Sequence, residues 1–409
     1  MAETFTKDEL HSWIQRSIGT ENFTFTVENT TQKGEGYIGE LFFVKVDLQQ
    51  PLNGKDVLYL VVKTNKKNPG SEKAISIVQD LCKREVFFYS TILKEYQIFQ
   101  NNKKLPVFFD IVPKCFKTFS EVDNEVVILE NLKKEGYMLH SRQHPMNIAH
   151  LEMGLKSYAK LHAMSFALKD QKREIFENIS KTCTSLIKDI FQNFKTVFDT
   201  KTPMLVEALK EADRSDLSIV YEKFINDKSI YTRFMEVSDT ISKDQALIHT
   251  DCHTANMMFQ YKGDDKTIPL RMALIDFQVV CLHSPIIDIS LFLHINISPT
   301  DVPKLKDFVE YYYTEFCSYL KQLGSDADKV FPRSIFEEQL KIYMPYGMFV
   351  TLTFLEMVYL DNSDALDLFD EETNEFFGGF TNDLKLKSRD KYLQRLVALV
   401  DSFFNGPFV

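Results

Sequence analysis

Residues 247–260 read L-I-H-T-D-C-H-T-A-N-M-M-F-Q, and no other stretch says as much about the fold. Within it His249, Asp251 and Asn256 follow the spacing H-x-D-x-x-x-x-N. Polar residues between two apolar runs favour a loop that joins two buried strands. We expect this loop to turn Asp251 and Asn256 toward one side, where both side chains reach the same cleft.

A predicted hairpin follows the loop. Residues 257–261 form one apolar strand, a polar turn comes next, and residues 270–275 form a second strand that ends at Asp276. In kinases a loop aspartate takes the proton of the acceptor hydroxyl, an asparagine five residues later holds Mg²⁺, and an aspartate after a hairpin also binds metal. The pattern therefore predicts phosphate transfer from ATP, with Asp251 as catalytic base and Asn256 and Asp276 as magnesium ligands.

Two other interpretations of these residues stay open at this point. The loop could be an ordinary surface loop whose polar side chains cap turns. Alternatively, a metal-dependent hydrolase could use five side chains as ligands: His249, Asp251, Cys252, His253 and Asp276. The other histidines offer no second paired ligand site, so the phosphotransferase is favoured.

The N-terminal part supplies candidates for the nucleotide site. Kinases place a lysine on a sheet strand and pair it with a glutamate on the next helix, so that the lysine reaches the ATP phosphates. Here Lys63 ends the apolar strand 58–63, and Glu85 lies in the predicted helix Ser71–Glu95. Taken singly, each is an ordinary surface residue, but their order before the catalytic loop supports a phosphate-binding pair.

A glycine-containing stretch and a hinge complete the predicted nucleotide site. Gly34 and Gly36 lie in K-G-E-G-Y-I-G, where backbone amides without side chains could approach phosphate. A plain hairpin explains these glycines equally well. The segment V-I-L-E-N-L places Glu130 and Leu132 where a hinge backbone would meet adenine.

The order of the predicted elements indicates an α+β, bilobal, protein-kinase-like fold. Strand-like alternation dominates the beginning of the chain, and helical periodicity dominates the rest, apart from the hairpin. We expect residues 1–131 to form a small antiparallel-sheet N-lobe that binds ATP. Residues 132–409 should form a large, mainly helical C-lobe with the catalytic loop and the acceptor pocket.

Composition narrows the class of protein. The 409 residues carry a formal net charge of −10, which does not favour nucleic-acid binding. The six cysteines form no C-x-x-C pair, which is typical of free thiols in a reducing compartment, so a cytoplasmic protein is predicted. Met344–Leu360 contains Pro345 and Glu356, and we expect a buried helix there, not a membrane span. No protein partner is implied.

With these residues in place, the chain resembles the ecdysteroid-kinase-like family of insects, which is related to choline kinases and aminoglycoside phosphotransferases. The resembling blocks are K-G-E-G-Y, Y-L-V-V-K-T, R-E-V-F-F-Y, V-I-L-E-N-L, Y-A-K-L-H-A-M-S-F, L-I-H-T-D-C-H-T-A-N, L-I-D-F-Q and S-P-I-I-D-I-S. The resemblance implies the roles given above and adds Asp288 as a brace of the catalytic loop. Thr250, His253 and Gly36 depart from the residues usual in the family.

The acceptor is expected to be a small molecule. Asp288 follows Asp276 by only 12 positions, which leaves no room for a segment on which a peptide could lie. The resemblance implies a hydrophobic alcohol, such as an ecdysteroid or a xenobiotic alcohol or phenol. A choline- or aminoglycoside-type kinase and a non-catalytic, hormone-binding pseudokinase remain alternatives. Gly347–Tyr359 and Phe376–Phe380 are the candidate walls of the acceptor pocket.

Overall fold

The structure is a computed structural model. It describes residues 5–30, 39–65, 72–105, 108–121, 124–360, 369–370, 375–376, 378–381, 384 and 386–406. The predicted glycine-containing segment with Gly34 and Gly36 lies outside these described residues. Of the predicted pocket wall Phe376–Phe380, Phe377 also lies outside them, whereas Phe380 is described and buried.

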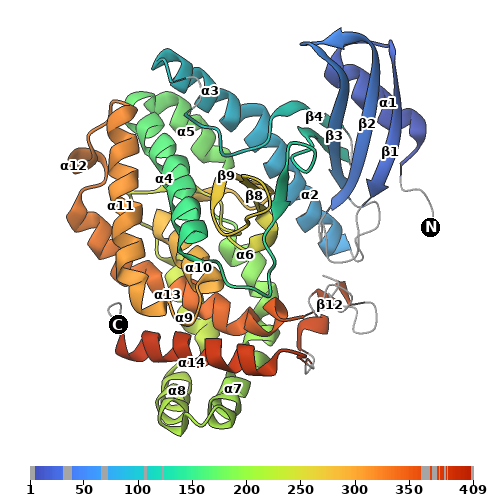
Figure 1. The fold of residues 1–409 in the computed structure, drawn as a ribbon. Helices are drawn as coiled ribbons and strands as arrows, with labels where there is room; N and C mark the ends of the chain where they lie inside the picture. Colours follow the sequence, from blue (N-terminus) through green and yellow to red (C-terminus); the bar gives the residue numbers. More distant parts are fainter. Residues whose placement is uncertain are drawn as a thin grey trace.

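A five-stranded antiparallel sheet forms the N-lobe, with the strand order β1-β2-β3-β5-β4 (Figure 1). Its strands are β1 (Phe23–Thr30), β2 (Gly39–Leu52), β3 (Lys55–Asn65), β4 (Cys115–Glu121) and β5 (Asn124–Glu130). Lys63 pairs with Leu41 on one side and with Val127 on the other, so β3 lies in the middle of the sheet. The predicted antiparallel sheet is confirmed, whereas β4 had not been predicted.

Helix α1 (Lys7–Ile18) covers one face of this sheet. Its first turn is closed by a capping box, in which the Thr6 hydroxyl accepts the Glu9 amide and the Glu9 carboxylate accepts the Thr6 amide. Trp13 and Ile14 are buried on the sheet side of the helix and pack against the apolar side chains of β2, β3 and β5.

A long helical rod connects the sheet to the rest of the molecule. It consists of α2 (Glu72–Phe87), a π-helical turn (Phe88–Ile92) and α3 (Leu93–Asn102). In the turn the Leu93 amide donates to the Phe88 carbonyl, five residues earlier, so the backbone is wider by one residue than an α-helix. A helix was predicted over Ser71–Glu95, whereas the observed helical segment continues to Asn102. The π-turn was not predicted, because the spacing of the apolar residues does not indicate it.

The C-lobe is mainly helical (Figure 1). Its helices are α4 (Ile148–Gln171), α5 (Arg173–Thr182), α6 (Ile187–Phe191), α7 (Lys195–Glu211), α8 (Ser215–Asp227), α9 (Ile230–Asp239), α10 (Pro285–Asn296), α11 (Leu305–Gln322), α12 (Ala327–Val330), α13 (Arg333–Val358) and α14 (Arg389–Asn405). The bilobal α+β architecture is thus as predicted. A lobe boundary between residues 131 and 132 remains a prediction.

Short strands are embedded among these helices and carry the predicted hairpin. β6 (Tyr137–Leu139), β8 (Met257–Tyr261) and β9 (Pro269–Leu274) form one antiparallel sheet; β7 (Ala246–Ile248) pairs with β10 (Cys281–His283), and β11 (Phe369–Asp370) with β12 (Glu375–Phe376). The hairpin of β8 and β9 confirms the prediction from the apolar runs. β7 therefore leads into the predicted catalytic loop, residues 249–256, and β9 leads to Asp276.

The centre of the C-lobe is the contact between α10 and α13. Helix α10 is buried on all sides, and the Ser284 hydroxyl caps its first turn. Most of the stretch Met344–Leu360 lies in α13 and is buried, which confirms the helix predicted there. Within the described ranges, no helix is both long enough and apolar enough to cross a membrane.

Gly347 allows α10 and α13 to approach closely. A Cβ at this position would lie 2.2 Å from the backbone carbon and 2.3 Å from the carbonyl oxygen of Ser290. Gly347 therefore faces a helix–helix contact and not a pocket, although it begins one of the predicted acceptor walls.

We expect Gly347→Ala to destabilise the protein, because a methyl group in this contact must push two backbones apart. Overpacking of a core commonly costs about 1–3 kcal/mol, and a clash with backbone belongs at the upper end. The free energy of unfolding in urea measures the effect. Lys341→Ala, an exposed change on the same helix, should alter it by less than about 0.5 kcal/mol. Equal effects of the two changes would contradict the prediction.

Candidate active site

Lys63 joins the two lobes at the predicted nucleotide site. Its ammonium lies 2.8 Å from Glu85 Oε2 on α2 and 2.9 Å from Asp276 Oδ1, which follows β9. The Lys63 and Glu85 side chains are only 10% and 3% exposed, whereas Asp276 is 30% exposed. The structure therefore brings together three residues that were predicted from separate parts of the sequence.

The strand next to Lys63 starts at a glycine. A Cβ on Gly39 would lie 2.8 Å from the Thr64 carbonyl oxygen and 3.6 Å from Lys63 Cε. Only a residue without a side chain fits there without a shift of β2 or β3. This close approach keeps the backbone of β2 directly beside the lysine.

Asp251 and Asn256 face each other across the catalytic loop. Asn256 Nδ2 donates to Asp251 Oδ2 at 2.7 Å and to the Asp251 carbonyl at 3.2 Å. The amide nitrogen of Asn256 is therefore used within the loop, and its oxygen accepts no hydrogen bond from the described residues. This assignment of oxygen and nitrogen follows from the hydrogen-bond network.

Asp276 offers the second free oxygen. Its Oδ1 binds Lys63, and its Oδ2 has no hydrogen-bond partner in the part of the chain that the structure describes. Its φ angle is +67°, in the left-handed region that aspartate adopts more readily than most residues. Asn256 and Asp276 thus present two hard oxygen donors, the ligand type that Mg²⁺ prefers, and Mg²⁺ takes its remaining ligands from water and phosphate. The residues fit the predicted metal.

Asp288 on α10 binds the backbone at the start of the predicted catalytic loop. Its two carboxylate oxygens accept the backbone amides of His249 and Thr250, both at 2.7 Å. Thr250 has a φ angle of +66°, which is strained for a β-branched residue. Its hydroxyl also donates to the Val279 carbonyl at 2.8 Å. These bonds fix a conformation that glycine would adopt freely.

A buried histidine supports Asp288. His162 on α4 lies 3.1 Å from Asp288 Oδ2 through Nε2 and 2.8 Å from the Tyr312 hydroxyl through Nδ1. Both His162 and Asp288 are fully buried. This pair was not predicted, because the two residues are distant in the chain and belong to no shared motif.

Aromatic stacking connects the π-turn to the strand end beside Asp276. The rings of Phe88 and Phe277 are parallel, with centroids 3.6 Å apart, and His249 lies 4.7 Å from Phe277 on the loop side. Arg84, one residue before Glu85, donates to the carbonyls of Thr184 and Val280. The helix that carries Glu85 is therefore anchored to the C-lobe as well as to Lys63.

The predicted hinge has one free donor. The Glu130 amide donates to the Lys114 carbonyl, and the Leu132 carbonyl accepts the amides of Glu135 and Tyr137. Among the described residues the Leu132 amide has no hydrogen-bond partner, so it remains available to a ligand. Contact of Glu130 and Leu132 with adenine stays a prediction.

The electrostatics of the site favour the charged forms of Asp251 and Lys63. Burial alone would raise the pKa of Asp251, but His253, His249 and Asn256 favour the carboxylate and bring its pKa to about 2. Burial alone would lower the pKa of Lys63, but Asp276 and Glu85 raise it above its usual value. Glu85 is the opposite case, since burial raises its pKa more than Lys63 lowers it. Asp251 is thus ionised at neutral pH.

The pKa of His253 reports which charges surround it. Burial lowers this pKa, the carboxylate of Asp251 raises it more, and Arg142 makes a smaller lowering contribution. The net pKa is raised. Arg142, in the segment between β6 and α4, is therefore close enough to act on the catalytic loop.

The metal-hydrolase interpretation finds no support in the geometry. His249 is occupied by the Ile275 carbonyl and the Asp251 amide. Cys252 is fully buried, and burial raises the pKa of its thiol. Across the described ranges, no three His, Cys, Asp or Glu side chains gather in a way that could hold a metal ion.

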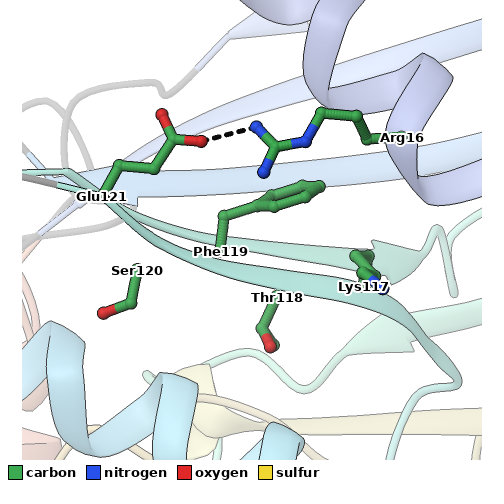
Figure 2. Close-up of a pocket in the computed structure, with 6 residues that line it drawn as sticks. All are labelled: Arg16, Lys117, Thr118, Phe119, Ser120 and Glu121. Atoms are coloured by element: carbon green, nitrogen blue, oxygen red, sulfur yellow. Dashed lines mark hydrogen bonds and ion pairs between the residues drawn. The ribbon is translucent and has the colours of Figure 1, made fainter.

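A shallow hollow of about 490 Å³ lies elsewhere, beside the outer strand β4. Figure 2 shows Phe119 and Glu121 pointing toward Arg16 of α1, while Thr118 and Ser120 point to the other side of the strand. Arg16 pairs with Glu121 at 2.5 Å and lies 4.2 Å from the centre of the Phe119 ring. The arginine is thus already satisfied, and none of the predicted site residues lines this hollow.

The comparisons with known proteins identify the family. The model of the ecdysteroid kinase-like family matches residues 33–325, well over half of the chain. The chain belongs to the ecdysteroid kinase-like family. The resemblance inferred from the sequence is thereby confirmed. The residues described above from Lys63 to Asp288 all lie within the span matched by the ecdysteroid kinase-like model, and this membership supports a kinase-type phosphotransferase for small molecules.

Several solved structures are similar over most of the chain. The GDP complex of wild-type aminoglycoside 2'-phosphotransferase-IIIa is 14% identical, covers 98% of this chain and 100% of its own, and gives a TM-score of 0.42. The AMP complex of a spectinomycin phosphotransferase is 12% identical, with coverages of 85% and 98% and a TM-score of 0.38. An aminoglycoside phosphotransferase from Alicyclobacillus acidocaldarius is 12% identical, covers 92% of this chain and 93% of its own, and gives a TM-score of 0.34. No match was found among curated proteins.

Proposed function

We propose that this protein transfers the γ-phosphate of ATP to a hydroxyl group of a small hydrophobic molecule, an ecdysteroid or a xenobiotic alcohol or phenol. One observation carries the proposal: the Lys63 ammonium lies 2.8 Å from the Glu85 carboxylate and 2.9 Å from that of Asp276. The loop with Asp251 and Asn256 belongs to the same site. Membership of the ecdysteroid kinase-like family supports the same reaction class.

Each residue has a defined task in this reaction. Lys63, held by Glu85, would bind phosphate oxygens, and the Leu132 amide would donate to adenine. Asn256 and Asp276 would hold Mg²⁺, which neutralises phosphate charge when bound. The acceptor oxygen forms the new bond to the γ-phosphorus, the bond from that phosphorus to the leaving ADP oxygen breaks, and the hydroxyl proton passes to Asp251.

The low pKa of Asp251 fits this kind of transfer. A carboxylate with a pKa of about 2 is a weak base, so it would not remove the proton before the phosphoryl group moves. In a loose transition state the acceptor needs little activation, and orientation of its hydroxyl matters most. Asp251 would therefore orient the hydroxyl first and accept the proton late.

The acceptor would approach between the catalytic loop and the end of α13. Arg142, whose charge acts on His253, donates to the Leu360 carbonyl at 2.7 Å, and Gln143 donates to the same carbonyl at 3.1 Å. These bonds tie the residue that follows the predicted wall Gly347–Tyr359 to the segment between β6 and α4.

Thermal stabilisation and an acceptor panel test the proposal. Mg-ATP should raise the melting temperature, because it binds only the folded state. ADP release should then appear with a steroid or a phenol in a panel that also holds choline and an aminoglycoside. Transfer to choline or the aminoglycoside alone would keep the kinase but reject the hydrophobic acceptor. Stabilisation by a steroid without any by Mg-ATP would reject the kinase in favour of the hormone-binding pseudokinase.

A further inference from the structure

His253 has a place in the catalytic loop that the kinase motif does not explain. It opens the 3₁₀ turn Thr254–Asn256 as its N-cap, and its Nδ1 accepts the Ala255 amide at 3.2 Å. N-cap positions are usually filled by Ser, Thr, Asp or Asn, whose short side chains end at the capping atom. An imidazole ring has a second nitrogen, Nε2, which the cap does not use.

The second nitrogen meets the predicted catalytic base. His253 Nε2 lies 3.2 Å from Asp251 Oδ1. Because Nδ1 accepts a backbone hydrogen bond, the proton of the neutral ring is on Nε2, and a charged ring carries a proton there too. The proton on Nε2 therefore faces the Asp251 carboxylate, and the two side chains form an ion pair when the ring is charged. The 3.4 Å distance from Nε2 to Asn256 Nδ2 joins two donors in this assignment and is not a hydrogen bond.

The Asp251 carboxylate is consequently held at both ends. His253 Nε2 contacts Oδ1 at 3.2 Å, and Asn256 donates to Oδ2 at 2.7 Å. One donor would leave the carboxylate free to rotate about its last bond, whereas two donors on different oxygens fix its plane. The lone pairs that remain then have fixed directions.

We propose that His253 is a positioning residue for phosphate transfer, which acts by fixing the plane of the Asp251 carboxylate against the acceptor hydroxyl. This inference rests on the proposed function. A small misalignment of a reacting group can cost about 100-fold in rate, so the bond to Oδ1 should affect turnover far more than nucleotide binding.

Two substitutions separate the two bonds of His253. His253→Asn keeps a side-chain oxygen that can cap the turn but is too short to reach Asp251. His253→Gln has a longer amide that can donate to Asp251 but is a poor cap. We expect His253→Asn to lower kcat by about 10- to 100-fold, with KM for ATP within about twofold. His253→Gln should recover a substantial part of kcat. His11→Asn, on α1, is the matched control and should leave both constants unchanged.

The outcomes are distinct. If His253→Asn turns over like the wild type, the ring serves only as a cap, and the inference is rejected. The inference is also rejected if kcat falls in step with folding stability across the three variants. In that case His253→Gln, the poorest cap, would be the slowest.

A second measurement needs no acceptor. In the ¹⁵N spectrum of the full chain labelled at histidine, His253 should carry a proton on Nε2, and the Asp251 carboxyl ¹³C signal should move in His253→Asn. An Nδ1–H tautomer would overturn the inference even in an active enzyme. A wild type that shows the Nε2 proton but transfers phosphate to no acceptor would instead reject the proposed function, and with it the role in transfer.

Discussion

Asp251→Asn should lower kcat by about 10²- to 10⁴-fold while Mg-ATP still stabilises the protein. The amide oxygen of the new side chain can still accept from Asn256 Nδ2, which now lies 2.7 Å from Asp251 Oδ2. The substitution thus removes the charge and the proton acceptor without removing the contact that shapes the loop. Its effect should therefore appear in turnover and not in folding.

Steady-state kinetics with the best acceptor of the panel, together with melting temperatures at saturating Mg-ATP, measure both parts. Asp264→Asn makes the same chemical change in the exposed turn between β8 and β9, and it should leave kcat as it is. A kcat for Asp251→Asn within threefold of the wild type would show that another group accepts the proton.

Lys63→Met should produce the largest loss of stability among changes in the cleft. It leaves two carboxylates without their shared cation: Glu85, whose side chain is only 3% exposed, and Asp276, whose side chain is 30% exposed. Breaking a buried ion pair by removal of one partner typically costs about 3–5 kcal/mol. Phosphate transfer should also be lost, because the two groups that remain, Glu85 and Asp276, are carboxylates and cannot replace the lysine as a phosphate-binding cation.

The pH dependence of this loss follows from the remaining carboxylate. Burial already raises the pKa of Glu85, and loss of Lys63 removes the charge that lowers it. The folded variant then binds a proton more tightly than the unfolded chain does, so its stability increases as the pH falls. Urea unfolding at pH 8 and pH 6 should therefore show a larger deficit, relative to the wild type, at pH 8.

The double variant Lys63→Met/Glu85→Gln is the control for this explanation. It removes the buried charge that the single variant leaves behind, and its stability should lie above that of Lys63→Met and depend less on pH. A double variant that is no more stable than the single one would mean that the loss comes from packing of the lysine stem.

The sequence predicted those parts of the site that follow local rules. The loop and the hairpin impose a fixed spacing in the sequence, which predicted Asp251, Asn256 and Asp276. Lys63 was predicted because the apolar residues before it indicate a strand. Contacts that depend on tertiary packing were not found. His162 and Asp288 meet only because α4 packs beside α10, and the stacking of Phe88 on Phe277 requires a π-turn that no pattern of residue types reveals.

Fold elements were missed for similar reasons. Strand β4 (Cys115–Glu121) is short and lies at the edge of the sheet, where several of its side chains are exposed, so its alternation is weak. The strands β6 and β10 have three residues each and exist only through their pairing partners. Roles of the site residues are a separate matter, and they remain predictions until the variants above are measured.

The π-turn at Phe88–Ile92 also has an evolutionary consequence. One surplus residue in a helix turns everything before it by about 100° relative to everything after it. Loss of a single codon from this turn would restore a regular helix but rotate Glu85 away from Lys63. The exposed turn between β8 and β9, in contrast, can gain or lose residues without moving the cleft. Relatives of this chain should therefore differ in length in the turn between β8 and β9, and they should keep the same length in the helical rod of α2, the π-turn and α3.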